Sequence, residues 1–376
     1  MDTTVSRLLA LLAVSVFLGW ISTASPAQAD EDPAIRGKKV TEWFKFLHEE
    51  KDPRRRQAAL QIIDLQAGPK VAVVFPGLLR EMREHPDPAI RARIAELLLK
   101  YKDKGDDLIK GLVSALKTDK DAKVRETAAT TLGKLERIGF SAAADLSEAL
   151  ADQSPGVRAA SADAIGQFSA IDAEIARDAI PGLAKCVKDA DPTVRLNSVL
   201  ALARMGPIAA SAAPALADAV KDDKDAGIRK ESAKTLAIMG PGACEAAPAL
   251  FKALEDSNPD VRQQAAYALG KINPDPKLAL PELLKAIKDK DKSVRYYAIH
   301  ALGSLGKPAA PAIPELIRVL KEDVVADVRL AAIEELANFG PDAKAALGAL
   351  MIASRDGKPA IREAAQDAVK KIQQSP

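Results

Sequence analysis

The chain has 376 residues, of which 48% are hydrophobic and only 4% are aromatic, so alanine and leucine supply most of the apolar surface. Its 54 Lys and Arg residues nearly balance 52 Asp and Glu residues, which gives a formal net charge of +2. This balance argues against the strongly basic surface of nucleic-acid and anionic-membrane binders, so we predict no nucleic-acid partner.

The first 29 residues have the three parts of a secretory signal peptide. Arg7 precedes an apolar run from Leu8 to Ile21, and Ala27 to Ala29 form an A-x-A cleavage site. The apolar run is shorter than the roughly 20 residues of a membrane-spanning helix. We therefore predict that residues 1–29 are removed, and that a periplasmic or extracellular chain with no membrane span remains.

An apolar residue followed by arginine recurs along the rest of the chain, every 33 to 37 residues. A fixed period of this size indicates a repeat array. The series begins at Arg56, where Arg55 takes the apolar place, and continues with Arg91, Arg125, Arg158, Arg195, Arg229, Arg262, Arg295, Arg329 and Arg362. These arginines predict repeats near residues 37–68, 69–104, 105–139, 140–170, 171–206, 207–240, 241–274, 275–306, 307–340 and 341–376.

Each repeat is predicted to contain two helices, of which the second, helix B, carries the arginine. Three residues after the arginine the side chain is usually small, as at Ala265, and seven residues after it is aliphatic, as at Leu269. This spacing puts both on one helical face. A polar residue followed by proline marks the predicted start of helix B, because the polar side chain caps the first turn and proline fits its first position. These capping residues are Asp52, Asp87, Ser154, Asp191 and Asn258.

Helix A precedes helix B and has the form Pro-x-Leu-x-x-x-aliphatic, as in Pro181, Leu183 and Val187. The proline is predicted to kink or segment helix A, because it cannot donate a backbone hydrogen bond. Gly-Pro pairs that begin at Gly206, Gly240 and Gly340 are predicted to end one helix B and open the next helix A.

The segments "DPTVRLNSVLALARMG" and "NPDVRQQAAYALGKI" carry a family resemblance. The chain resembles the HEAT-like helical repeat proteins, close to the short bacterial type named after phycobilisome lyases. The resemblance implies an all-α fold, a right-handed α-solenoid (an armadillo-like superhelix) of about ten two-helix repeats that forms a single domain over residues 30–376. It also implies that helix B lines the concave face, and that a turn Asp and a helix Arg of neighbouring repeats form a hydrogen-bonded ladder. On that basis Arg91, Arg125, Asp191, Arg195, Arg262 and Arg295 are structural residues.

Motifs for catalysis or metal binding are scarce. The sequence holds neither a P-loop nor a complete nucleophile elbow. Its histidines, His48, His85 and His300, fall in three separate repeats. Cys186 and Cys244 are two repeats apart, roughly 20 Å in a helical stack, so we predict no disulfide between them. We expect no catalytic residue, no metal and no cofactor, and therefore not an enzyme.

A non-enzymatic scaffold that binds a protein or peptide along the concave face is the predicted function. Three of the four tyrosines gather on the expected open face of two neighbouring repeats, with cations and an amide nearby. The predicted contact residues are Lys230, Lys234, Gln263, Tyr267, Tyr296, Tyr297 and His300. An extended or acidic peptide is the expected ligand; alternatively, the tyrosines simply pack against the next helix. An enzyme-associated protein of the phycobilin lyase type is the alternative function, supported by the repeat alone.

Overall fold

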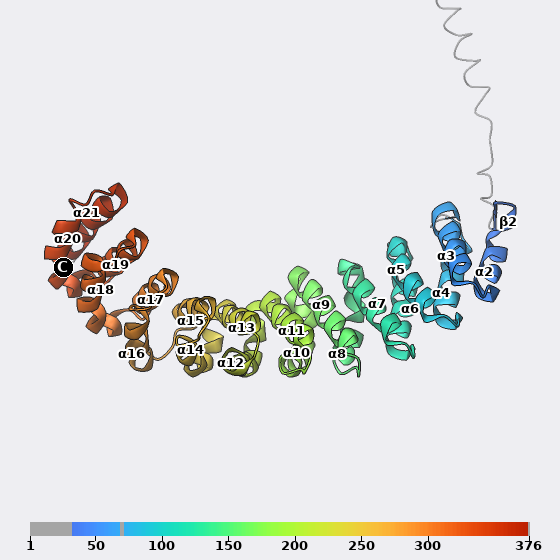
Figure 1. Ribbon diagram of the computed structural model, residues 1–376, viewed down its shortest axis with the longest axis horizontal. Helices are drawn as coiled ribbons and strands as arrows, with labels where there is room; N and C mark the ends of the chain where they lie inside the picture. The colour runs from blue at the N-terminus through green and yellow to red at the C-terminus, as the bar shows by residue number, and fades with distance from the viewer. Residues whose placement is uncertain (1–31, 68–70, 375–376) are drawn as a thin grey trace, which may run out of the picture. The chain divides into compact units, whose positions relative to one another are not determined.

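The structure, a computed structural model, describes residues 32–67 and 71–374, so the predicted signal peptide lies outside the described residues. The chain divides into two compact units between Tyr101 and Lys102. Figure 1 labels the helices of both units.

The first unit begins with a small antiparallel hairpin, a departure from the predicted all-helical chain. β1 (Ala34–Ile35) pairs with β2 (Lys38–Lys39) across a turn in which Arg36 and Gly37 have φ of 50° and 78°. Trp43 donates from Nε1 to the Ile35 carbonyl at 2.8 Å, which ties the hairpin to the first helix. The following helices are α2 (Val40–Glu49), α3 (Pro53–Ile62), the π-helical turn η1 (Ile63–Ala67), α4 (Val74–Glu84), α5 (Pro88–Leu97) and η2 (Leu98–Lys104), the last of which crosses the unit boundary.

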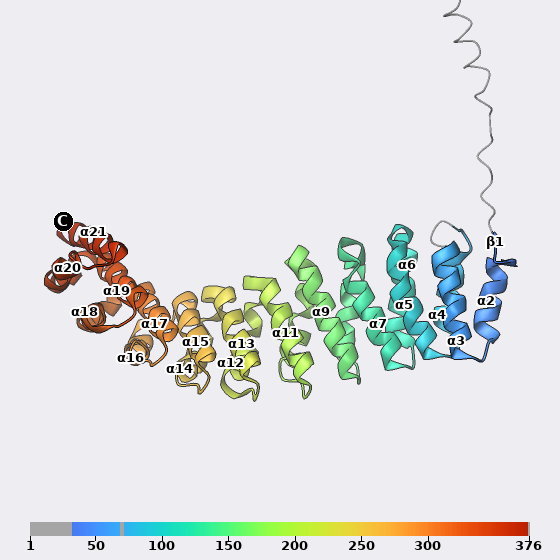
Figure 2. The same cartoon turned by 45° about the horizontal axis from the view of Figure 1, so that its top comes forward.

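The second unit is a stack of helix pairs in two layers (Figures 1 and 2). Helix A of each repeat packs against the helix B that follows it, and each helix B packs against the next helix B. The helix A layer contains α6 (Gly105–Thr118), α8 (Ala143–Ala149), α10 (Ile180–Cys186), α12 (Ala213–Asp222), α14 (Ala247–Ala253), α16 (Pro276–Ala286), α18 (Ile313–Glu322) and α20 (Leu347–Ala353). The helix B layer contains α7 (Ala122–Gly133), α9 (Pro155–Ile171), α11 (Pro192–Met205), α13 (Ala226–Met239), α15 (Pro259–Ile272), α17 (Lys292–Ser304), α19 (Ala326–Asn338) and α21 (Pro359–Gln374).

Most of the predicted capping residues do cap helix B. The side chains of Asp52, Asp87, Asp191 and Asn258 each accept a hydrogen bond from a backbone N–H of the first turn. Ser154 occupies the same position, but its side chain makes no cap bond, so that prediction is wrong. At this turn the carboxylate of Asp152 instead accepts the Ser154 N–H at 2.7 Å.

Helix A is segmented in most repeats, as the prolines predict, but α16 is an exception because Pro281 lies inside one continuous helix. In most repeats a 3₁₀ segment comes first, and the proline then occupies the first turn of the α-helix, where its missing N–H costs nothing. The 3₁₀ segments are η3 (Glu136–Ala142), η4 (Ala173–Ala179), η5 (Gly206–Ala212), η6 (Gly240–Ala246), η7 (Lys307–Ala312) and η8 (Gly340–Ala346). Gly206, Gly240 and Gly340 mark the change from helix B to helix A with φ of 64°, 66° and 56°, a conformation that favours glycine.

Small residues allow neighbouring B helices to approach closely. A Cβ at Gly133 would lie 2.8 Å from both Cα and Cβ of Ala164 on the next helix B. Gly166 and Gly270 meet Ala201 and Ala301 in the same way. The glycine lies eight residues after the ladder arginine of one repeat, and its partner six residues after the arginine of the next. This contact explains why small residues recur at these two places in the repeat.

A ladder of arginine–aspartate pairs joins successive repeats of the second unit. In each rung, Nε and Nη2 of the arginine donate to the two carboxylate oxygens of an aspartate before the next helix B, at 2.6 to 3.1 Å. The third nitrogen, Nη1, donates to two carbonyls of the arginine's own turn, as Arg262 does to Asp256 and Ser257. The pairs are Arg125–Asp152, Arg158–Asp189, Arg195–Asp223, Arg229–Asp256, Arg262–Asp289 and Arg295–Asp323.

The predicted ladder places the wrong aspartate in the rung. Asp191, the predicted ladder residue, caps α11 by accepting from the N–H groups of Thr193 and Val194. Asp189, two residues earlier, accepts from Arg158 of the preceding repeat. In the first unit the cap residue does both, since Asp87 caps α5 and also lies 2.6 Å from Nη2 of Arg56. In the first unit Arg91 donates to the carbonyls of His85 and Pro86.

The segment Pro192–Asp222 is long and apolar enough by composition to cross a membrane. It is not one straight helix, because Gly206 divides it into α11, η5 and α12. Half of its apolar window is buried within the protein. This burial identifies the segment as core of the solenoid.

We expect Arg262→Ala to lower the free energy of unfolding by about 3–5 kcal/mol, because it leaves the largely buried Asp289 carboxylate without its cation. Arg262→Lys should also destabilise, since an ammonium cannot span both carboxylate oxygens and the turn carbonyls. Lys285→Ala is the matched control: it breaks an exposed pair with Glu282 and should change the unfolding free energy by less than about 1 kcal/mol. Urea unfolding measures all three, and equal effects of Arg262→Ala and Lys285→Ala would contradict the structural role of the ladder.

The ladder also predicts acid sensitivity. Burial raises the pKa of Asp289, but the bonds from Arg262 and from the Asp291 N–H outweigh it and lower the pKa below its ordinary 3.8. The unfolded chain therefore binds more protons in this range, so the stabilisation is complete above pH 3.8 and is lost as pH falls through the folded-state value. We expect the urea concentration at half unfolding to decrease once the pH is lowered beyond about 4. The Asp289→Asn variant should be less stable than the wild type at neutral pH, and its stability should depend less on pH in the acid range. Asp178→Asn, at an exposed position on η4, should keep the wild-type profile.

Candidate functional site

Three tyrosines from α15 and α17 form one contiguous cluster on the helix B layer. Tyr267 on α15 meets Tyr297 on α17 edge to face, with ring centroids 5.5 Å apart. Tyr297 meets Tyr296 in the same manner at 5.2 Å. Tyr267 is 36% exposed, whereas Tyr296 and Tyr297 are half-buried. The rings therefore pack against one another and still present a surface.

His300 extends the cluster toward α19. Its ring lies 4.5 Å from that of Tyr296, and its Nδ1 donates to Oε1 of Glu335 at 2.7 Å, because a carboxylate can only accept. Its Nε2 is buried without a hydrogen-bond partner in the described part of the chain. Glu335 is itself buried and also accepts from Asn338 at 3.1 Å. The pair holds the His300 ring against Tyr296.

Glu335 is an exception to the repeat. Its position, six residues after the repeat arginine, carries alanine or threonine in the other described repeats of the second unit: Thr131, Ala164, Ala201, Thr235, Ala268, Ala301 and Ala368. Its carboxylate lies over Gly303, where any side chain would overlap it. Gly303 thus makes room for a buried carboxylate that the plain repeat does not need.

An open groove of about 380 Å³ lies beside the cluster, between α17 and α19. Tyr296 and Tyr297 form one wall, and Leu330 and Glu334 of α19 line the other side. Gln263, Lys292, Ser293, Val325, Asp327, Val328 and Ala331 complete the lining. Burial, Glu334 and Tyr297 raise the pKa of Tyr296, with smaller contributions from Asp327 and Glu335. The groove is therefore aromatic and close to several carboxylates.

The two lysines of the predicted contact set lie outside this groove. Lys230 on α13 is 3.9 Å from Asp260, and Lys234 is 3.4 Å from Glu231 of its own helix. Their charges are thus balanced locally. Three other predicted contact residues, Gln263, Tyr296 and Tyr297, do line the groove. Tyr267 packs against Tyr297, and His300 packs against Tyr296.

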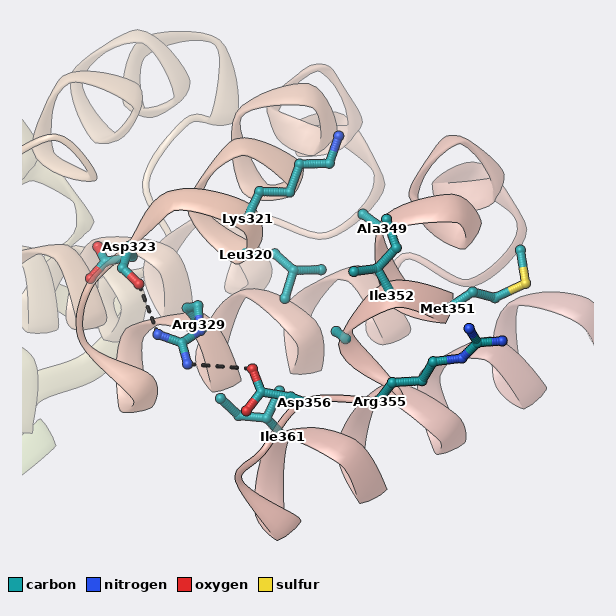
Figure 3. A pocket seen from close by; sticks show the side chains of 11 residues that line it. Leu320, Lys321, Asp323, Arg329, Ala349, Met351, Ile352, Arg355, Asp356 and Ile361 are labelled. Carbon is teal, nitrogen blue, oxygen red and sulfur yellow. Dashed lines mark hydrogen bonds and ion pairs between the residues drawn. The ribbon is translucent and has the colours of Figure 1, made fainter.

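A larger cavity, of about 750 Å³, lies between α18 and α20 (Figure 3). Similar crevices of about 510 and 490 Å³ recur between earlier A helices, at the Arg295 and Arg262 rungs. The crevice in Figure 3 is the same feature at the next arginine, Arg329, which forms a looser ion pair: its Nη2 is 3.6 Å from Asp356. It follows from the repeat. Grooves between B helices recur as well, since one of about 710 Å³ lies between α3 and α5 in the first unit. The groove beside Tyr296 and Tyr297 differs from it by its aromatic wall, which the repeat does not require, so the tyrosine groove is the stronger candidate site.

The first unit contains a histidine contact that the sequence analysis missed. His48 and His85, from separate repeats, have ring centroids 5.7 Å apart. His85 donates from Nε2 to the Leu47 carbonyl and accepts the Asp87 N–H at Nδ1, both at 3.0 Å. His48 pairs with the buried Glu81 at 2.9 Å. Because the backbone occupies both nitrogens of His85, this contact is structural.

Both cysteines are free thiols. Cys186 is buried on α10 and donates from Sγ to the Leu150 carbonyl at 3.4 Å, and burial raises the pKa of its thiol. Cys244 is exposed on η6. Neither lies at the tyrosine groove.

The family known as HEAT repeats matches the chain over residues 75–166, 143–237, 229–279 and 247–337. The chain belongs to the HEAT-repeat family. This membership and the stacked helix pairs confirm the predicted all-α solenoid. No curated protein matches the chain.

Among solved structures, the HEAT-repeat chain is similar to importin beta, crystallised in a polyethylene glycol condition, with a TM-score of 0.60 and 15% sequence identity. The similarity covers 89% of this chain but 52% of importin beta, so the chain spans about half the length of that relative. At this identity the likeness concerns the fold alone. HEAT-repeat solenoids are commonly scaffolds for protein binding.

Proposed function

We propose that this HEAT-repeat protein is a non-enzymatic scaffold that binds an extended segment of a partner protein on its helix B layer, at α15, α17 and α19. The observation that carries the proposal is the groove between α17 and α19, beside which the tyrosines gather. Tyrosine buries a large apolar area on binding, at a low cost in side-chain entropy, and keeps a polar hydroxyl.

The form of the groove favours binding over catalysis. Reaction sites exclude water in enclosed pockets, whereas this groove is open to solvent along the helix layer. His300 and Glu335 pair as a base and an orienting carboxylate do in enzymes, but the Nε2 that would act as the base is buried. The pair supports the Tyr296 ring instead.

We expect Tyr296→Ala combined with Tyr297→Ala to weaken peptide binding at least about tenfold, because aromatic contact residues carry much of the binding energy of an interface. A display library of short peptides, selected on the mature chain, supplies the ligands, and fluorescence anisotropy measures their affinities. Leu278→Ala is the matched control, since Leu278 is 59% exposed but lies outside the groove. The proposal fails if no peptide is selected, or if the double variant binds as the wild type does.

We also propose that the mature chain is exported, to the periplasm or outside the cell. Arg7, the apolar run that follows it and the A-x-A site at Ala27 to Ala29 support this. When the full chain is expressed in a bacterium with a Sec pathway, we expect the envelope or secreted fraction to contain a protein that begins near Asp30. Retention of Met1 on a cytoplasmic product, measured by intact-mass spectrometry, would refute export.

A further inference from the structure

The charges around the tyrosine groove are unevenly paired. Asp327 and Glu334 on α19 line the groove, are exposed and have no ion-pair partner in the described part of the chain. The nearby lysines of α13, in contrast, are already paired with Asp260 and Glu231. Lys292 lies on the groove as well, so the lining carries two carboxylates against one ammonium.

Lysine ammonium groups lie over some aromatic rings of the protein but not over others. Lys271 places its ammonium 5.5 Å from the centre of the Tyr267 ring, and Lys38 does the same over Trp43 in the first unit. This protein thus uses cation–π contacts where an aromatic face and a cation meet. Among the described residues, Tyr296 and Tyr297 have no such cation over their rings, although they line the groove next to the two carboxylates.

We propose that this groove binds a cationic side chain, an arginine or a lysine, of the partner peptide. The inference rests on the proposed binding function and names the chemistry of its ligand. A guanidinium or ammonium would lie against the faces of Tyr296 and Tyr297 and pair with Asp327 and Glu334. One cation would thus occupy the free aromatic faces and neutralise the unpaired carboxylates. The charge preference is therefore the reverse of the acidic peptide that the sequence suggests, because the lysines behind that expectation are neutralised by their own neighbours.

The rigidity of the tyrosine wall supports this role. Tyr296 is held between Tyr297 and the His300 ring, which Glu335 fixes from beneath. Tyr297 is braced in turn by Tyr267. A wall whose side chains are already ordered loses little entropy when a ligand docks on it.

The test uses three fluorescein-labelled peptides of equal length, in which glycine alternates with arginine, with neutral citrulline or with glutamate. We expect the arginine peptide to bind best to the mature chain. Asp327→Asn with Glu334→Gln should weaken that binding about tenfold, as expected when two exposed charge pairs are lost. Tyr296→Phe should retain it, because the aromatic face remains, and Lys292→Gln should strengthen it. The matched control, Asp178→Asn with Glu245→Gln, removes two exposed carboxylates elsewhere and should bind the arginine peptide like the wild type.

Two results would overturn the inference. One is equal or tighter binding of the citrulline or glutamate peptide. The other is an equal effect of the groove and control charge variants, which would mean that the arginine peptide responds only to overall charge. If the glutamate peptide binds and the Tyr296→Ala, Tyr297→Ala variant abolishes that binding, the proposed scaffold function stands and only the cation preference fails. If neither these peptides nor the display library yields a ligand, both fail.

Discussion

The second unit depends on the hydrogen-bonded ion pair between each ladder arginine and the aspartate of the next repeat. One planar group with a fixed set of donors closes the turn of its own repeat through Nη1 and grips the next repeat through Nε and Nη2. Burying a charge is costly unless its partner is buried with it, and the aspartate of every such rung is largely shielded. The cost of burial therefore makes the ladder specific, because a repeat out of register leaves an unpaired charge. The ladder sets the register of neighbouring repeats, and apolar contacts between their helices add further stability.

Regular parts of the molecule were the easiest to predict from sequence. The period of the arginine predicts the number of repeats, and the Pro and Gly positions predict where most A helices are segmented. The aspartate that accepts the ladder arginine was harder to predict. Asp189 and Asp191 are two residues apart in the same turn. Only the three-dimensional structure shows that Asp191 caps α11 and that Asp189 pairs with Arg158 of the preceding repeat. The β1–β2 hairpin could not be predicted, since its strands are two residues long and depend on a tertiary bond from Trp43.

The candidate site was predictable only where the repeat is broken. Tyr267, Tyr296 and Tyr297 stood out because nothing in the repeat requires them, and the rings do meet. Electrostatics could not be predicted in the same way, because the charge that a ligand meets depends on which side chains are already paired. Lys230 and Lys234 look available in the sequence, whereas Asp327 and Glu334, which drew no attention there, are the unpaired groups. Glu335 was missed as well, although a glutamate in a column of alanine and threonine is a visible signal.

The contact between Glu335 and Gly303 has a consequence for how this site can change over evolutionary time. A side chain at position 303 would displace the carboxylate, release His300 and loosen the support of Tyr296. Shortening Glu335 to the alanine of a plain repeat would leave Nδ1 of His300 without its acceptor. The dependence therefore runs one way. Glycine at this place in the repeat also faces alanine, as Gly270 faces Ala301, so a homologue can lose Glu335 and keep Gly303. A homologue with a side chain at position 303, in contrast, is expected to have lost the glutamate and with it the ordered aromatic wall.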